Sequence, residues 1–326
     1  MKGVIERDLG TYEGQVAESY QKYNLVISNH LVFNPMDLIS GWVDIPNTEG
    51  LISPSYRVLE KKDKELNLDF FKYYFQTLYK EKILFYFGEG VHYEYRWGLG
   101  SDTLMNFPIP VPSILEQQQI VSFLDHKTHS INLLIEKIEK KIQLLNEQRT
   151  SLINKCVTKG LDPNVEMKES GIEWIGDIPS HWEMKKLKYL FSLIGGKDPK
   201  KIQNYEGNYP ILGTGGEIDR GDDYLYDQKT LLLGRKGTID RPFLFNGPFW
   251  VSDVMYYTVQ KTDMTPDYIS YLFKTFPFDY YVYGSTQPSM SRLDYEQHFF
   301  SVPPNNEQED ILKFLHKKTK IINESI

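Results

Sequence analysis

The chain has 326 residues, 40% of them hydrophobic and 25% charged, a balance that excludes an intrinsically disordered protein. Its single cysteine, Cys156, excludes an intramolecular disulfide and a cysteine-based zinc site, and no signal segment or long apolar stretch is visible, so we expect a soluble cytoplasmic protein outside any membrane. The net charge of −7 argues against uniform binding to nucleic acid, so any DNA contact has to come from local clusters of arginine and lysine.

Residues 1–112 and 161–302 share a pattern of short apolar runs separated by turn signals, which predicts small sheets. The runs that we expect to form strands are 24–27, 230–233, 243–245 and 255–259, and glycine-rich turns fall at 213–216 and 234–237. Amphipathic segments at 70–75 and 267–273 predict a short helix that closes each lobe. Each lobe is therefore expected to be mixed α and β.

Between the two lobes, residues 113–160 predict a single long helix. Glu116 places negative charge near its start, and Gly160 is a suitable residue to end it. Apolar side chains recur with spacings of four and three residues, which is typical of a coiled-coil seam. The seam consists of Ile131, Ile135, Ile138, Ile142, Leu145, Arg149, Leu152 and Cys156. A helix from 114 to 159 would be about 65–70 Å long, and its seam requires a partner helix.

The start of this helix is repeated near the end of the chain. Residues 111–135 align without gaps to residues 302–326, and about half of the positions are identical. The aligned pairs include Glu116 with Glu307, and Ile131 with Ile322. We therefore expect a second helix from residue 303 onward, and it is the obvious partner for the seam. Cys156 falls on the seam, where a buried, small apolar residue is expected.

Several motifs together resemble one known family. Residues 169–183 (ESGIEWIGDIPSHWE) and the basic run at 184–188 resemble the start of a target-recognition domain. The two helix starts of the form Pro-x-x-x-Glu-Gln, and the segment 284–291 before the second of them, match the same family. The chain is similar over nearly its whole length to the specificity subunits of type I restriction–modification systems.

The resemblance implies an architecture and a set of partners. Such subunits carry two target-recognition lobes, of mixed α and β structure, separated by long conserved coiled-coil helices, and each lobe reads half of a split sequence in double-stranded DNA. The helices hold two modification (adenine methyltransferase) subunits, and restriction subunits join that complex. For this chain the resemblance implies a partial first recognition domain at 1–112, a spacer helix at 113–160, a second recognition domain at 161–302 and the start of a second conserved helix at 303–326. The subunit performs no chemistry and needs no cofactor or metal.

The chain also departs from the family pattern. The signature at 169–183 occurs only before the second lobe, and an alignment of the strands suggests that roughly 60 residues of the first lobe are missing. The second helix is short as well. We expect a chain truncated at both ends: a fragment, a product of recombination, or one part of a split subunit.

Candidates for DNA contact are polar or cationic residues on expected loops of the lobes. In the second lobe they are Arg235 and Lys236 on a tight turn, then Ser285, Thr286, Gln287 and Arg292, and more weakly Arg220 and Arg241. In the first lobe they are Asn29, His30, Arg57 and Arg96. Each has a structural alternative: a solvated hairpin tip for the first pair, a capping turn for 284–292, and packing for the others. His30 lacks companions at ligand spacing, so a metal site there is not expected. Trp174 and Trp182 are expected to pack at the start of the second lobe.

Two rival functions remain open. The chain could be a coiled-coil scaffold that no longer reads DNA. It could also be a metal-dependent nuclease, because Asp177, Glu183 and Lys185 have the bare order of such a site, although they fall within the family signature. The motif of adenine methyltransferases is absent, and residues 213–216 do not form a nucleotide-binding loop.

Overall fold

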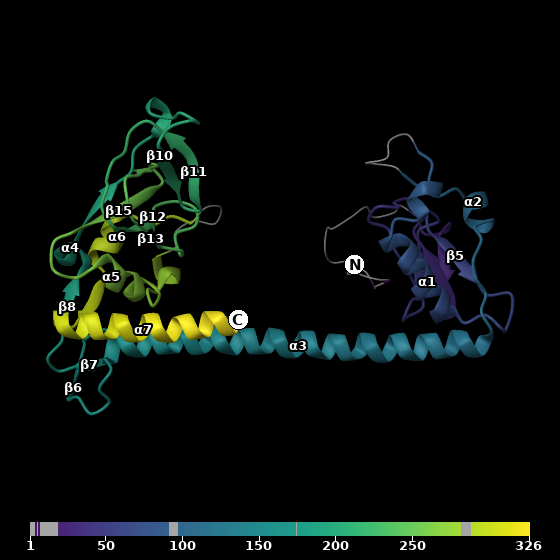
Figure 1. Ribbon diagram of the computed structural model, residues 1–326, viewed down its shortest axis with the longest axis horizontal. Coiled ribbons are helices and arrows are strands. Elements are labelled where there is room, and N and C mark those ends of the chain that lie inside the picture. Colours follow the sequence, from purple (N-terminus) through teal and green to yellow (C-terminus); the bar gives the residue numbers. More distant parts are fainter. Residues whose placement is uncertain (1–3, 5, 7–18, 91–96, 174, 282–287) are drawn as a thin grey trace. The chain divides into compact units, whose positions relative to one another are not determined.

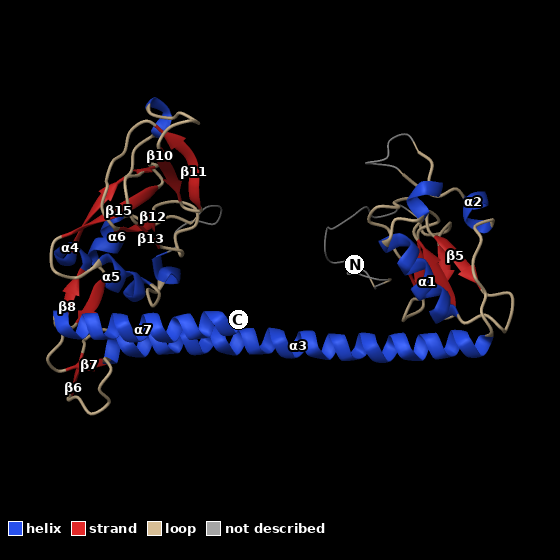
Figure 2. Cartoon of the chain, in the orientation of Figure 1, coloured by secondary structure: helices blue, strands red, loops and turns tan. Residues whose placement is uncertain are grey.

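The computed structural model describes residues 4, 6, 19–90, 97–173, 175–281 and 288–326. The chain divides into two compact units, Met1–Glu136 and Lys137–Ile326, and each is described by itself (Figures 1 and 2). None of the helices in these described ranges is long and apolar enough to cross a membrane. The mixed α and β fold class predicted from the sequence is confirmed.

The first unit is built on a small antiparallel sheet with strand order β3-β2-β5, beside a separate ribbon of β1 and β4. The strands are β1 (Asn24–Val26), β2 (His30–Phe33), β3 (Val43–Asp44), β4 (Gly50–Ile52) and β5 (Arg57–Glu60). The helical elements are α1 (Leu68–Lys80), the 3-10 turn η1 (Leu84–Phe87) and α2 (Ser101–Met105). Phe33, Phe75 and Tyr79 pack together in the core, so α1 covers the sheet with its aromatic face. The helix expected around 70–75 is confirmed as α1.

The long helix is α3 (Ile114–Lys159), with the bounds expected from the sequence. At its start, the backbone N–H of Ser113 donates to the Glu116 carboxylate at 3.0 Å, and the Ser113 hydroxyl donates to the same carboxylate at 2.7 Å. At its end, Gly160 has a φ of +74°, the left-handed conformation that a residue with a side chain rarely adopts. Both ends are therefore determined by local sequence.

The second unit contains a four-stranded antiparallel sheet with the order β13-β12-β15-β9 and a three-stranded sheet with the order β11-β10-β14. Their strands are β9 (Phe191–Gly195), β10 (Tyr209–Gly213), β11 (Gly216–Gly221), β12 (Thr230–Gly234), β13 (Phe243–Phe245), β14 (Trp250–Val251) and β15 (Met255–Gln260). Two ribbons join β6 (Met167–Glu169) to β7 (Asp177–Pro179) and β8 (Glu183–Lys186) to β16 (Phe299–Val302). The helical elements are α4 (Leu187–Leu190), η2 (Pro199–Lys201), α5 (Pro266–Phe273), η3 (Phe278–Tyr281), α6 (Arg292–Gln297) and α7 (Asn305–Ser325).

Helix α7 lies against the C-terminal part of α3 in antiparallel orientation (Figure 1). The Arg149 guanidinium donates to the Asn323 side chain at 3.0 Å, while Lys159 and Glu307 line one pocket at the other end of the pair. Cys156 is 3% exposed and belongs to the same core as the apolar side chains of α7, as its place on the seam predicts.

The seam residues differ in burial along α3. Leu152 is partly buried against the core of the second unit, whereas Ile131, Ile135 and Ile138 are 56%, 48% and 47% exposed. The N-terminal part of the seam therefore presents apolar side chains to solvent, and the C-terminal part packs within the second unit.

The internal repeat seen in the sequence makes the same contact in each unit. The side-chain amide of Gln117 donates to the Pro112 carbonyl at 2.8 Å, and that of Gln308 donates to the Pro303 carbonyl at 2.9 Å. Both glutamines are buried. The two helix starts are thus structural copies as well as sequence copies.

Candidate nucleic-acid interface

One edge of the four-stranded sheet in the second unit brings together the ends of three strands. Gly234 at the end of β12 pairs with Met255 at the start of β15, and the next residue, Tyr256, pairs with Gly195 at the end of β9. The loops that leave β9 and β12 and the turn that leads into β15 must therefore lie side by side. We call this edge, with residues 196–201, 235–239 and 252–254, the loop edge.

Backbone hydrogen bonds hold the loops of the loop edge together. Lys197 donates its N–H to the Val251 carbonyl at 3.0 Å, and Arg235 donates to the Val254 carbonyl at 2.7 Å. The turn 252–254 is thus flanked by one basic loop on each side. Gly196 permits this approach, because a Cβ at that position would lie 2.0 Å from the Ser252 carbonyl oxygen. The loop positions are therefore determined by the backbone and do not depend on the cationic side chains.

The structure places Arg235 and Lys236, two of the candidates, at the exposed surface of the loop edge. The Arg235 guanidinium makes one long contact, at 3.4 Å, with the Asp253 carbonyl. Lys236 is exposed, and its backbone pairs with Ser289. Both side chains are available to an anionic or polar ligand.

Three further lysines on the loop edge were missed by sequence reasoning. Lys197, Lys200 and Lys201 are exposed on the loop and turn that follow β9, where the indole N–H of Trp250 donates to the Lys197 carbonyl at 2.8 Å. Lys200 lies 3.5 Å from Asp198, which is the one acidic residue of the loop. The run Gly-Gly-Lys-Asp-Pro-Lys-Lys at 195–201 was the available signal, since paired glycines followed by lysines mark a basic turn. Positive charge therefore gathers here although residues 161–302 carry a net charge of −5.

The remaining candidates of the second unit differ in their availability. Arg220 uses its guanidinium to bind the Gly207 and Asn208 carbonyls, each at 2.8 Å, and Glu217 at 3.0 Å. These contacts hold the β10–β11 hairpin, which is a structural task. Arg241 is exposed on the β12–β13 connection. Ser285, Thr286 and Gln287 lie outside the described residues, as do Arg96 of the first unit and Trp174.

In the first unit, His30 is buried and occupied by contacts within the lobe. Its ring accepts a hydrogen bond from the Ile27 N–H at 3.4 Å and lies 3.0 Å from the Glu60 carboxylate. Asn29 beside it is exposed. Arg57 lines an open groove of about 580 Å³ that also includes Met36 and Glu89. Among the candidates of this unit that the structure describes, Arg57 is thus the one that lines a groove.

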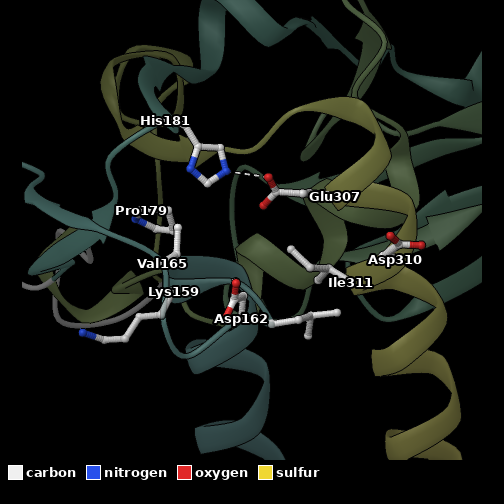
Figure 3. Close-up of a pocket in the computed structure, with 10 residues that line it drawn as sticks. Lys159, Asp162, Val165, Pro179, His181, Glu307, Asp310 and Ile311 are labelled. Atoms are coloured by element: carbon white, nitrogen blue, oxygen red, sulfur yellow. Dashed lines mark hydrogen bonds and ion pairs between the residues drawn. The ribbon is translucent and has the colours of Figure 1, made fainter.

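A pocket of about 200 Å³ lies where α3 ends and α7 begins (Figure 3). His181 projects toward the Glu307 carboxylate, and its Nε2 is within hydrogen-bonding distance of that carboxylate. The same carboxylate accepts a hydrogen bond at 2.9 Å from the indole N–H of Trp182, which is fully buried. The signature segment thus anchors the second lobe to α7, which agrees with the packing role expected for Trp182.

Two residues of the nuclease alternative are engaged with each other. Glu183 and Lys185 form an ion pair at 2.6 Å, and this contact lowers the pKa of the Glu183 carboxyl. The described residues contain no group of three or more His, Cys, Asp or Glu side chains that could hold a metal ion. The geometry gives no support to a metal-dependent reaction at this position.

Comparisons with known proteins agree on one family. A sequence model of the type I restriction modification DNA specificity domain matches residues 42–144 and 179–326. The MjaVIII type I restriction enzyme specificity subunit of Methanocaldococcus jannaschii is 27% identical over 207 residues, which are 60% of this chain and 46% of that protein. The chain thus spans less than half the length of this curated relative.

Two solved structures share the fold. A chain from a study of complex assembly and conformational transition of the type I R-M system has a TM-score of 0.77 at 13% identity, covering 94% of this chain and 78% of the other. The HsdS subunit of Thermoanaerobacter tengcongensis has a TM-score of 0.55 at 13% identity, covering 94% and 77%. Because the family model matches well over half of the residues, the chain belongs to the family of type I restriction modification DNA specificity domains.

Proposed function

We propose that this protein is a DNA-binding specificity subunit, which directs modification and restriction subunits to a split DNA sequence and performs no catalysis itself. The observation that carries the proposal is the loop edge, where five cations gather on a unit that is otherwise acidic. Family membership supports the same reading. We propose a cytoplasmic location as well, where such a subunit would meet DNA and its partners.

The loop edge suits DNA for two physical reasons. Its lysines can each neutralise a phosphate and release counterions, which supplies affinity but no sequence preference. Arg235 and Lys236 lie on a loop whose backbone is held by Val254, so their side chains start from a defined position, as base recognition requires. We infer that Lys197, Lys200 and Lys201 bind phosphates while Arg235 and Lys236 approach base edges.

We propose that α3 is the part of the chain that binds other proteins of the complex. Its seam residues Ile131, Ile135 and Ile138 are about half exposed, and an apolar stripe on a helix is a suitable surface for another protein. We propose that the modification subunits dock along this part of α3 and that restriction subunits join through them. In this proposal residues 1–112 and 161–302 read DNA, and the helix between them, residues 113–160, binds protein.

The test is methylome sequencing of a host that carries this chain with its modification subunit, compared with a host that lacks the gene for this chain. Loss of one split adenine-methylated motif on deletion is the expected result. The triple variant Lys197→Ala, Lys200→Ala, Lys201→Ala should weaken methylation of that motif, whereas Lys168→Ala, an exposed lysine on β6, should not. An unchanged methylome on deletion of the gene contradicts the proposal and favours the scaffold alternative.

A further inference from the structure

The two units share an arrangement that the sequence alone does not reveal. In the first unit, the Leu99 N–H donates to the Pro35 carbonyl at 2.7 Å, and in the second the Met290 N–H donates to the Arg235 carbonyl at 3.0 Å. Leu99 and Met290 are 191 residues apart, the same interval as the repeated helix starts. The loop that follows β2 therefore corresponds to the loop that follows β12, and the repeat extends upstream into the lobes.

A short helix follows this contact in both units. Helix α2 begins at Ser101 and α6 begins at Arg292, again 191 residues apart. Each helix buries the residue at its fourth position, Leu104 in α2 and Tyr295 in α6. Ser101 and Arg292 are therefore equivalent positions at equivalent helix starts.

The strands supply a second pair of equivalent positions. Phe33 of β2 pairs with Arg57 of β5, and Leu233 of β12 pairs with Tyr256 of β15. The matched carbonyls of Pro35 and Arg235 each lie two residues after these strand residues, Phe33 and Leu233, so Arg57 and Tyr256 occupy the same place beside the loop. In the first unit, Arg57 occupies the strand position and Ser101 the helix position. In the second unit, these positions are occupied by Tyr256 and Arg292.

The two positions are in contact in the first unit and close together in the second. The Arg57 Nε donates to the Ser101 hydroxyl at 3.0 Å. In the second unit, the ring of Tyr256 lies 6.1 Å from the ring of Tyr295 of α6, and the Tyr295 hydroxyl donates to the Gly234 carbonyl at 2.8 Å, so the start of α6 lies beside the end of β12. The strand therefore supplies a guanidinium at this junction in the first unit, Arg57, and the helix supplies one in the second, Arg292, where Arg235 of the neighbouring loop is a further cation.

The orientation of each guanidinium is restrained through its Nε. Arg57 is held by Ser101 and, through Nη1, by the Pro54 carbonyl at 3.3 Å. Arg292 is held by Glu296, with 2.6 Å between Nε and the carboxylate. An arginine restrained in this way presents a planar pair of donors in a fixed direction, which matches the O6 and N7 acceptors of guanine.

We propose that Arg57 and Arg292 are equivalent specificity residues, each of which reads a guanine in the half of the DNA sequence recognised by its own unit. The proposal rests on the proposed function, since it assumes that both units bind DNA. Arg57 lies on β5 and Arg292 on α6, and the two residues do not align with each other in the repeat.

The test is selection from a randomised duplex DNA library by the full chain in complex with its modification subunit. The variants are Arg57→Lys and Arg292→Lys, which keep the charge but lose the planar pair of donors. The control is Arg149→Lys on α3, whose guanidinium binds Asn323 and not the junction. Arg57→Lys should reduce the preference for guanine at one position of one half-site by about five- to 150-fold, and Arg292→Lys should do so in the other half-site only.

Each outcome is informative. The salt dependence of binding should stay as in the wild type, because the charge is retained. A wild-type motif that lacks guanine in either half, an unchanged motif in both variants, or a uniform loss of affinity for all sequences overturns the proposal. If the wild-type complex selects no sequence at all, the proposed function fails with it, and this result is distinct from the others.

Discussion

The indole N–H of Trp182 donates a 2.9 Å hydrogen bond to the Glu307 carboxylate and thereby joins the start of the second lobe to the first turn of α7. Trp182 is fully buried, and His181 contacts the same carboxylate (Figure 3). One acidic side chain in the repeated helix start thus holds two residues of the signature segment. The signature has a structural role in this protein.

Replacement of Glu307 should destabilise the second unit. Glu307→Ala leaves the buried indole N–H without its acceptor, which costs about 1–3 kcal/mol of the free energy of unfolding. Glu307→Gln keeps an acceptor oxygen and should cost less. Urea unfolding followed by tryptophan fluorescence measures both values, with the exposed Glu309→Ala as control. Equal losses in the two Glu307 variants would contradict the assigned hydrogen bond.

The two repeated glutamines should differ in importance. Gln117 accepts a hydrogen bond from the Asn67 N–H at 2.8 Å and also donates to the Glu65 and Pro112 carbonyls. Gln308 donates to the Pro303 carbonyl and to the Asn305 side chain. Gln117→Ala leaves more buried backbone groups unpaired, so it should lower the free energy of unfolding more than Gln308→Ala does. The same unfolding measurement compares them, and the opposite order would refute this prediction.

Removal of cations from the loop edge should change the salt dependence of DNA binding. The slope of log K against log salt should become shallower by about 0.9 for each phosphate contact that is lost. The triple variant of Lys197, Lys200 and Lys201 should show this change with the preferred sequence retained, because phosphates carry no sequence information. Fluorescence anisotropy of labelled duplex DNA over a range of salt concentrations measures the slope. A wild-type slope in the triple variant would exclude these lysines from the interface.

The exposed and buried parts of α3 should respond differently to one substitution. Ile138→Ser removes an exposed side chain and should change the free energy of unfolding by only about 0.5 kcal/mol, but should weaken binding of the modification subunit. Ile153→Ser alters a residue that is 3% exposed in the core and should cost at least about 2 kcal/mol. Unfolding curves and co-purification with the modification subunit separate the two effects. Undiminished co-purification of the Ile138 variant would argue against docking on this stripe.

The stability of the second unit should decrease at mildly acidic pH because of His298. Burial beside the rings of Phe276 and Phe300 lowers the pKa of His298 from 6.5 to about 4. Between pH 6.5 and 4, His298 therefore binds a proton in the unfolded state but not in the folded state. The free energy of unfolding is highest above pH 6.5 and decreases as the pH falls toward 4. The loss should reach about 3 kcal/mol.

The control for this pH effect is His298→Phe, which retains an aromatic ring but has no site for a proton. Its free energy of unfolding should be less dependent on pH between 6.5 and 4 than that of the wild type. Urea unfolding at half-unit steps of pH measures the difference. Parallel curves for the two proteins would show that His298 does not cause the effect.

The sequence by itself determined the elements whose causes are local. The bounds of α3 follow from Ser113 and Glu116 at one end and from Gly160 at the other, all within one turn of the helix ends. The short apolar runs and the repeat interval of 191 residues were readable for the same reason, since they depend on neighbours in the chain. These features sufficed to predict the fold class and the family.

Only the tertiary structure decided which residues meet. Lys197 and Arg235 flank one turn because β9 and β12 both pair with β15, a long-range arrangement that no local pattern records. Contacts within the fold likewise occupy the side chains of His30 and Arg220, two of the candidates named from the sequence. The proposed equivalence of Arg57 and Arg292 depends on strand register and on a helix start at once. Register and packing arise from contacts between distant segments, and these are fixed only when the chain has folded.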